Sequence, residues 1–256
     1  MEKPVTLIIG LGQTVGEAIA QRFAEGGHAI LAVDPSQALL DDLAKTVDVP
    51  VATHHGPTHT QLGIRNAMAA ALEAYGRIDN VVCTPKLPQA DALLDLEMDD
   101  FEEAVLESIS GAVKALRIFA QEMISNAEEP ESAADRNRQS GSFTFVLSLN
   151  ALLTESGWFT ESVTQNALLG VVRSASIELA PHNIRVNAIT ALRPRAEKRE
   201  TWLKARTPAG RTALAEEIGE AAFFLASAST AIMTGEALTL DGGRRNLSGL
   251  MPEEAD

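Results

Sequence analysis

The feature of this sequence that most constrains its fold is a regular alternation of short apolar runs with longer stretches of helical periodicity. Most of the runs are continuously apolar rather than alternating, which is typical of parallel strands buried on both faces. They predict strands at Val5–Ile9, Ala29–Val33, Val49–Thr53, Ile78–Cys83, Phe143–Leu149, Ile184–Ile189 and Ala237–Leu240.

The segments between these runs predict helices. Val15, Ile19 and Phe23 recur every four residues, and comparable apolar stripes lie within residues 64–75, 101–123, 163–175 and 214–225. Strand–helix alternation along the whole chain predicts right-handed βαβ units. We therefore expect an α/β fold, a Rossmann-like doubly wound parallel sheet of seven strands with helices on both faces.

The chain reads as a single domain over residues 1–256. Residues 126–141 are rich in charge and lack an apolar anchor, which predicts a surface loop before the fifth strand. Residues 250–256 predict a C-terminal tail outside the packed core.

Charge and cysteine content exclude several classes of function. The formal net charge is -14, so phosphate backbones and anionic lipid surfaces would be repelled, and neither nucleic acid nor membrane is expected as a partner. Cys83 is the only cysteine, so no intrachain disulfide can form. The single cysteine, together with the lack of a long apolar stretch after Met1, predicts a cytoplasmic protein.

A glycine-rich turn follows the first apolar run and opens the first helix. Glycines at such a turn let the backbone approach a pyrophosphate, and the helix N-terminus offers free N–H groups. The spacing is G-x-G-x-x-x-G rather than the usual G-x-G-x-x-G. The turn predicts a phosphate site; the alternative is a strand–helix turn with no ligand. Its residues are Gly10, Gly12, Gln13, Val15 and Gly16.

Asp34 follows the second apolar run. A carboxylate there can accept hydrogen bonds from an adenosine ribose and would repel a 2′-phosphate. No Lys or Arg follows it directly, so NAD is favoured over NADP as the cofactor. The alternative is an aspartate that caps a helix.

Several segments, in order along nearly the whole chain, resemble the short-chain dehydrogenase/reductase family, and most closely its 3-oxoacyl-carrier-protein-reductase-like branch. They are residues 75–79 (YGRID), 177–181 (IELAP), 183–189 (NIRVNAI) and 234–243 (TGEALTLDGG). The resemblance implies strand order 3-2-1-4-5-6-7 and a homodimer or homotetramer. In the family the helices at 101–123 and 163–180 form the main subunit interface. Thr84, in the segment after the fourth strand, becomes a candidate cofactor contact.

The family's chemistry depends on four residues: an Asn, a Ser, a Tyr and a Lys four residues after the Tyr. Alignment equates these with Ser108, Leu149, Ser162 and Asn166, and places Ser148 on the opposite face of its strand. Tyr75, the only tyrosine, lies in a structural segment. A phenol of pKa ~10 needs a nearby cation to work near neutral pH. Loss of one acid–base group removes ~10²–10⁴ in rate, so we expect little or no carbonyl reduction.

Three hypotheses remain open from the sequence. The first is a non-catalytic or very weak NAD-binding member, acting as a sensor or as a subunit beside an active homologue. The second is an active NAD-linked oxidoreductase that uses Lys86, or Ser162 with water. The third is a scaffold that binds no nucleotide, which Thr14 and His54 favour. No metal site is predicted, because Gly56 and Pro57 break the helical spacing of His55 and His59.

Overall fold

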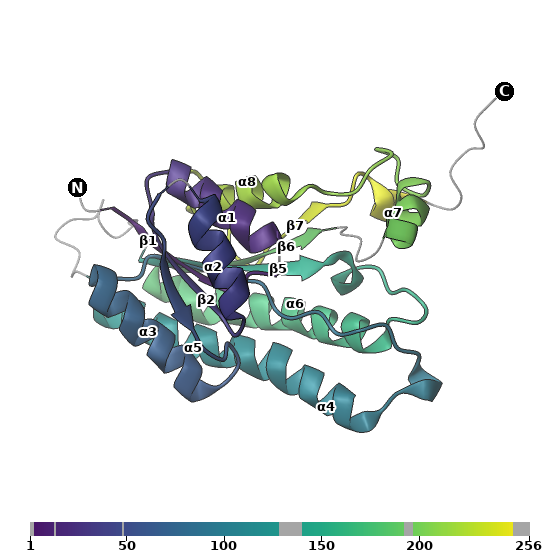
Figure 1. Ribbon diagram of the computed structural model, residues 1–256, viewed down its shortest axis with the longest axis horizontal. Coiled ribbons are helices and arrows are strands. Elements are labelled where there is room, and N and C mark those ends of the chain that lie inside the picture. The colour runs from purple at the N-terminus through teal and green to yellow at the C-terminus, as the bar shows by residue number, and fades with distance from the viewer. Residues whose placement is uncertain (1–2, 13, 48, 128–139, 192–196, 248–256) are drawn as a thin grey trace.

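The computed structural model describes residues 3–12, 14–47, 49–127, 140–191 and 197–247. Within them a single sheet of seven parallel strands runs in the order β3-β2-β1-β4-β5-β6-β7 (Figure 1). This confirms the expected Rossmann-like fold and strand order. The strands are β1 (Val5–Ile9), β2 (Ala29–Asp34), β3 (Ala52–His55), β4 (Asn80–Cys83), β5 (Gly141–Ser148), β6 (Ile184–Ala191) and β7 (Ala237–Leu240).

The strand register fixes where a ligand site can form. Ile9, the last residue of β1, lies opposite Val33 of β2 and Cys83 of β4. The carboxyl ends of the three strands therefore meet at one edge, where Asp34 ends β2 and Thr84 follows β4. This edge, where the strand order reverses around β1, is the usual ligand crevice of doubly wound sheets.

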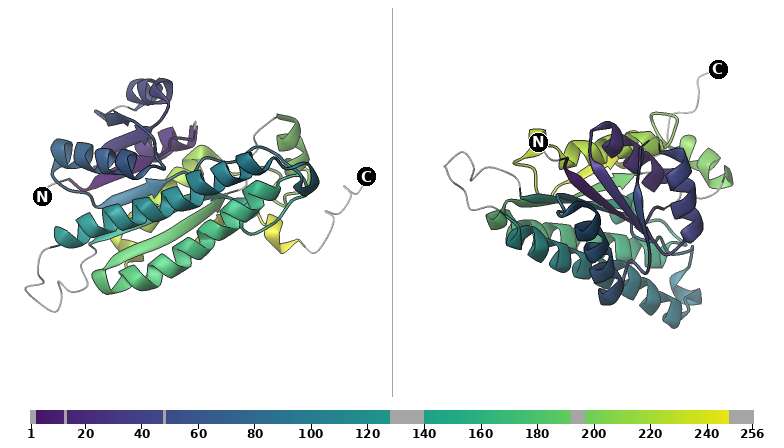
Figure 2. Two further views of the ribbon diagram at one scale, coloured as in Figure 1. Left: turned by 90° about the horizontal axis from the view of Figure 1, so that it is seen from below. Right: turned by 60° about the vertical axis from the view of Figure 1, so that its left-hand side comes forward.

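Two helical layers cover the sheet (Figure 2). On one face, α3 (Gln61–Tyr75), α5 (Gly111–Ser125) and α6 (Phe159–Leu179) bury a core that includes Phe119, Phe143 and Leu168. On the other, α1 (Thr14–Glu25), α2 (Gln37–Thr46) and α8 (Ala215–Ala226) pack around Ile19, Phe23 and Ile218. Among the described residues, no helix combines the length and apolar character needed to cross a membrane.

The structure departs from the predicted elements in several places. The third strand begins at Ala52, not Val49, because Pro50 cannot donate to a sheet. The single helix expected over 101–123 is α4 (Met98–Val105), a π-helical turn (Leu106–Ser110) and α5 in succession. Two helices were not predicted: α2, whose first turn is capped by the Ser36 hydroxyl, and α7 (Glu197–Lys204).

The predicted surface loop is described only at its two ends, and the predicted tail is not described. The structure ends α5 at Ser125 and begins β5 at Gly141, while residues 128–139 and the whole tail at 250–256 lie outside the described residues.

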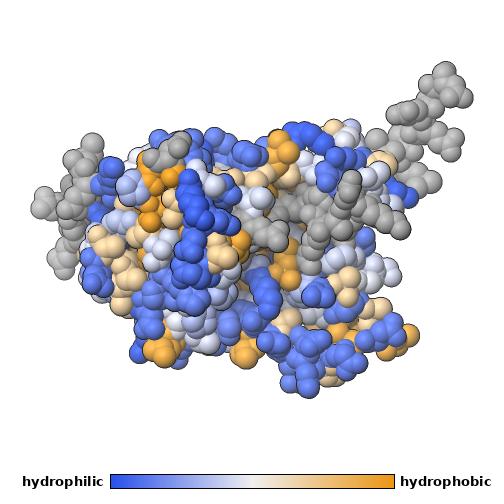
Figure 3. Space-filling model, in the orientation of Figure 1, coloured by the Kyte–Doolittle hydropathy of each residue, from blue (hydrophilic) through white to orange (hydrophobic). Residues whose placement is uncertain are grey.

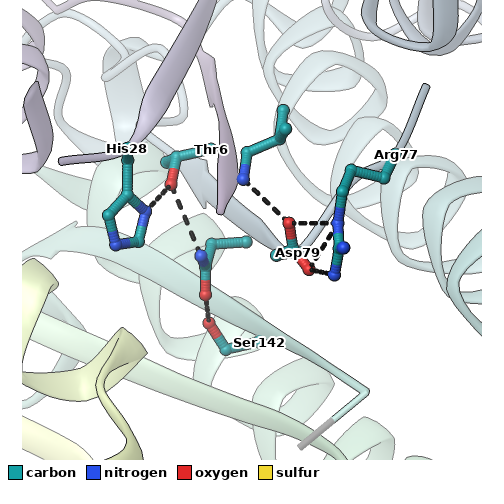
Figure 4. Close-up of polar contacts among 7 residues, drawn as sticks. Thr6, His28, Arg77, Asp79 and Ser142 are labelled. Atoms are coloured by element: carbon teal, nitrogen blue, oxygen red, sulfur yellow. Dashed lines mark hydrogen bonds and ion pairs between the residues drawn. The ribbon is translucent and has the colours of Figure 1, made fainter. Parts of the chain in front are cut away.

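A buried polar network joins the strands at the amino edge of the sheet (Figure 4). His28 Nδ1 lies 2.9 Å from Thr6 Oγ1, which also accepts from Asn80 Nδ2 at 3.4 Å. Ser142 Oγ donates to Asn80 Oδ1 at 2.7 Å. These hydrogen bonds pair polar side chains of β1, β4 and β5 with one another. The network therefore stabilises the sheet far from the ligand edge.

Candidate functional site

A cleft of about 760 Å³ opens at the carboxyl edge of the sheet. Its volume is in the range of pockets that hold drug-sized ligands. Residues from both halves of the chain line it, among them Gly10, Gly12, Asp34, Thr84, Lys86, Glu107, Ser108 and Ser148.

Glycines in the turn between β1 and α1, and in the first turn of α1, allow the backbone to pack closely. Gly10 and Gly12 have φ of 78° and 52°, in the left-handed region that glycine tolerates. A Cβ on Gly10 would lie 2.6 Å from the Thr84 carbonyl oxygen, and one on Gly16 would lie 2.4 Å from the Leu11 carbonyl oxygen. Gly10 and Gly12, which line the cleft, therefore present bare backbone to it.

Asp34 fixes this turn to the end of β2. Its Oδ2 accepts the Leu11 N–H at 2.8 Å and its Oδ1 accepts the Ser36 N–H at 2.7 Å. The side chain is buried yet lines the cleft. Asp34 is not the cap of α2, since Ser36 holds that position. Each carboxylate oxygen retains a further lone pair for a ligand hydroxyl.

The other residues expected to contact a cofactor do not all line the cleft. The Thr84 hydroxyl donates to the Gly10 carbonyl and lines the cleft. Val15 is buried in the core beneath α1. Gln13 lies outside the described residues.

Lys86 is held in an ion pair at the mouth of the cleft. Its Nζ lies 2.9 Å from Glu107 Oε2, and this hydrogen bond raises the pKa of Lys86. His59 Nδ1 lies 3.9 Å from the other oxygen of Glu107. The lysine is therefore a protonated, paired group rather than a free proton donor.

The positions aligned with the family's Ser, Tyr and Lys do not gather at the cleft. Leu149 packs against Leu203 of α7, and Asn166 is exposed on α6. Ser162 is buried, with no hydrogen-bond partner for its Oγ among the described residues. The expectation that Ser148 faces away from the site is wrong: Ser148 ends β5 and lines the cleft, because the chain turns into a short helix directly after it. Ser108 lines the cleft as expected.

Two buried polar residues of α6 lie close to Ser148: one contacts it directly, and the other lies one helical turn away. The sequence alignment does not identify either of them as a site residue. Gln165 Oε1 accepts the Ser148 N–H at 2.9 Å. Glu161, one turn earlier, is 3% exposed and accepts from Asn150 Nδ2 at 3.1 Å. Both belong to the buried stripe of α6 that continues through Leu168 and Val172. The apolar stripe expected within residues 163–175, which includes Val163, Ala167 and Val171, is only half-buried and is therefore out of phase with the buried face.

Cys83 and Tyr75, which could otherwise react, are buried or lie away from the cleft. Burial raises the pKa of the Cys83 thiol to about 12, so it stays neutral. The Tyr75 hydroxyl donates to the Ile30 carbonyl oxygen at 2.9 Å and does not line the cleft. Across the ranges that the structure describes, no group of three or more His, Cys, Asp or Glu could hold a metal ion.

Comparison with known proteins gives one consistent result. A family model described as enoyl-(acyl carrier protein) reductase matches residues 10–245. The 3-oxoacyl-[acyl-carrier-protein] reductase FabG of Thermotoga maritima is 27% identical, over 95% of this chain and 98% of its own. Galactitol 2-dehydrogenase of Cereibacter sphaeroides is 26% identical, over 92% of both chains.

A similar solved structure is the 3-ketoacyl-(acyl-carrier-protein) reductase from Brucella melitensis, complexed with NADH. It superposes with a TM-score of 0.86 at 25% identity, covering 95% of this chain and 98% of its own.

Proposed function

Because this chain belongs to the short-chain dehydrogenase/reductase family, on its 3-oxoacyl-carrier-protein-reductase-like branch, we propose that it binds NAD but is a non-catalytic or very weak member. One observation carries the proposal. The glycine turn and Asp34 are built for a dinucleotide, while Ser108 and Ser148 line the other part of the cleft and Gln165 accepts the Ser148 N–H. Among the described lining residues there is no tyrosine, and Lys86, the one lysine, is paired with Glu107.

The residues at the outer part of the cleft fit a dinucleotide. The bare backbone of Gly10 and Gly12 and the N-terminus of α1 would hold its pyrophosphate. Asp34 would accept the adenosine ribose hydroxyls and repel a 2′-phosphate, which favours NAD over NADP. The NADH complex of the Brucella reductase supports this assignment.

The described lining residues of the cleft include no tyrosine and, apart from Lys86, no lysine, which supports a loss of the family's proton-transfer groups. A bound nicotinamide supplies or accepts a hydride. We equate Gln165 with the family's lysine and Glu161 with its tyrosine, one residue before the positions expected from sequence. A neutral amide at Gln165 cannot lower a neighbouring hydroxyl's pKa, and the hydroxyls of Ser108 and Ser148 are weak acids. Loss of general acid–base catalysis alone removes ~10²–10⁴ in rate.

A second candidate function is an active NAD-linked oxidoreductase with an unusual acid. The buried Glu161 carboxyl, hydrogen-bonded to Asn150, favours it, because a carboxyl group is a general acid–base group and lies at the tyrosine position. Turnover of ketones or alcohols that disappears in Glu161→Gln would support this candidate. Absence of turnover in the natural chain would exclude it.

We also propose a cytoplasmic homo-oligomer, or a hetero-oligomer with an active homologue. Exposed apolar side chains gather over α4 and the segment before it, among them Leu93, Leu94 and Met98 (Figure 3). Light scattering that finds only a ~27 kDa species would contradict a homo-oligomer, and pull-down from the native cell tests for an active partner.

The proposal is tested by calorimetric titration with NAD and then NADP. We expect saturable heat with NAD and at least tenfold weaker binding of NADP. Turnover assays over 3-oxoacyl thioesters, ketones and alcohols should show no rate above background. No heat with either nucleotide would overturn the binding assignment, and clear turnover would overturn the non-catalytic one.

A further inference from the structure

A second cavity, of about 490 Å³, opens at the amino edge of the sheet, at the opposite end of the strands from the cleft. Pro4, Asn80 and Gly141, at the starts of β1, β4 and β5, line one wall, and residues 226–228, where α8 ends, line another. The volume lies within the range of pockets that hold small organic molecules. The cavity is therefore large enough for a ligand of its own.

His28 lines this cavity and ends a chain of hydrogen bonds that begins inside the sheet (Figure 4). The Ser142 hydroxyl donates to Asn80 Oδ1 at 2.7 Å, and Asn80 Nδ2 donates to Thr6 Oγ1 at 3.4 Å. Thr6 Oγ1 therefore receives one hydrogen and has its own hydrogen to donate. Among the described residues, the one partner left to accept that hydrogen is His28 Nδ1, at 2.9 Å.

The direction of this chain assigns the tautomer of His28. A ring nitrogen that accepts a hydrogen bond carries no hydrogen, so the neutral ring holds its hydrogen on Nε2. Burial lowers the pKa of His28, which favours the neutral ring. Nε2 lies on the side of the ring away from Thr6 (Figure 4) and has no hydrogen-bond partner in the part of the chain that the structure describes. His28 Nε2–H is therefore a donor that awaits an acceptor.

Aromatic packing holds this donor in place. The His28 ring makes edge-to-face contacts with Phe23 and Phe223, at centroid separations of 5.2 and 5.6 Å. Phe223 also lines the cavity, and the Arg22 guanidinium lies 3.8 Å from the centroid of its ring. A group that is already fixed loses little conformational freedom on binding, so it contributes more of its hydrogen bond to affinity.

The hydrogen-bonding groups that the cavity offers are mainly donors. His28 supplies Nε2–H, and Asn80 Nδ2 keeps a second hydrogen after its bond to Thr6. The side chains of Phe223 and Ala226 belong to the apolar part of the lining. A carbonyl oxygen has two lone pairs and suits two such donors, while an apolar group attached to it would pack against the phenyl ring.

The charges around the cavity favour a neutral ligand. Its described lining residues include no Lys or Arg, and Asp79 is their one acid. Asp79 Oδ2 already accepts from the Val5 N–H at 2.8 Å and from Arg77 Nε at 3.0 Å. A carboxylate would therefore lose its hydration without gaining a cation, and an ammonium group would have to compete with Arg77 for Asp79.

We propose that the cavity at the amino edge of the sheet is a second ligand site, in which His28 Nε2–H and Asn80 bind the carbonyl oxygen of a small neutral molecule and Phe223 packs against its apolar part. The site lies at the other end of the strands from the cleft, so it depends neither on dinucleotide binding nor on turnover.

NMR of the full chain, labelled with ¹⁵N in the histidine rings, tests both the tautomer and the binding. At pH 8, Nε2 of His28 should carry the hydrogen and Nδ1 should not. Acetanilide, a neutral amide with a phenyl ring, should shift the His28 signals saturably. It should leave unchanged the signals of His59, which lines the cleft. Phenylacetate, a carboxylate of similar size, should bind at least tenfold more weakly.

Substitution of the donor gives the matched comparison. His28→Phe keeps an aromatic ring between Phe23 and Phe223 but removes the N–H, so it should bind acetanilide about tenfold more weakly, from one lost hydrogen bond. His182→Phe, at an exposed position, is the control and should bind as the natural chain does. Saturation-transfer NMR measures both variants.

A hydrogen on Nδ1 instead of Nε2, His28 signals that do not move with acetanilide, equal binding of phenylacetate, or unchanged binding by His28→Phe would each overturn the site. The first three outcomes are measured on the natural chain, so they decide the proposal even where the variant does not fold. NAD titrations with and without acetanilide should give the same affinity. Competition between the two would place the probe in the cleft and would also overturn the site.

Discussion

The backbone N–H of Ser148 donates to the side-chain Oε1 of Gln165 at 2.9 Å, which joins the end of β5 to the buried face of α6. This bond identifies the residues of α6 that lie beside the cleft. Asn166, the next residue, is exposed. The site positions on α6 are therefore those in phase with Gln165, namely Gln165 and Glu161.

The assignment of Glu161 and Gln165 to the site can be tested by introducing the family's tyrosine and lysine at these two positions. Glu161→Tyr/Gln165→Lys should yield measurable NADH-dependent reduction of a 3-oxoacyl thioester, because the phenol and the cation would be placed beside Ser148. Ser162→Tyr/Asn166→Lys should yield none, since the lysine would lie in solvent. We expect ~10²-fold or more over the unmodified chain, from acid–base catalysis. Activity only in the second pair would show that the assigned phase is wrong.

Asp34 should be essential to both stability and NAD binding. Asp34→Ala leaves the N–H groups of Leu11 and Ser36 without their acceptor, at a cost of about 2–5 kcal/mol in the free energy of unfolding. Urea denaturation measures this loss, and calorimetry should show NAD affinity falling with it. Asp42→Ala, at an exposed position of α2, is the control. A stable Asp34→Ala variant would contradict the role assigned to this carboxylate.

The Cys83 thiol should be unreactive in the folded protein. Its pKa is raised to about 12 by burial, so almost no thiolate exists between pH 7 and 9. A chromogenic disulfide reagent should label the thiol only in denaturant. Rapid labelling of the native chain would show that the end of β4 is open to solvent.

His28 should make the protein less stable in acid. Burial lowers its pKa, an effect that Asp79 opposes and Arg22 reinforces. The folded state therefore favours the neutral ring. Its contribution is present above the unfolded pKa of ~6.5 and is lost as the pH falls below that value.

Urea denaturation between pH 7.5 and 5 measures this dependence. His28→Gln should flatten the decline, whereas His182→Gln, at an exposed position, should not. Identical slopes in all three proteins would exclude His28 as the cause.

The sequence predicted the architecture well and the inner end of the site poorly. Continuous apolar runs identify buried parallel strands, and β1 and β7 begin and end as expected. The sequence does not predict the helix α2, because its buried stripe consists only of Leu40 and Leu43.

The error at the site has a definite cause. Counting back from a downstream glycine assumes an unchanged spacing, and one residue of slip rotates a helical position by about 100°. Burial separates Gln165 from Asn166, and the hydrogen bond from Ser148 confirms which of them faces the sheet. Such a contact between two distant segments of the chain cannot be recognised from the local pattern of apolar and polar residues.

The most direct test of the account follows the fluorescence of NADH mixed with the protein, before and after addition of a 3-oxoacyl thioester or ketone. Binding in the cleft without proton transfer predicts a saturable change in NADH emission on mixing. That signal should then stay constant for hours with every carbonyl compound. A steady decay of the emission, proportional to protein concentration, would contradict the central claim.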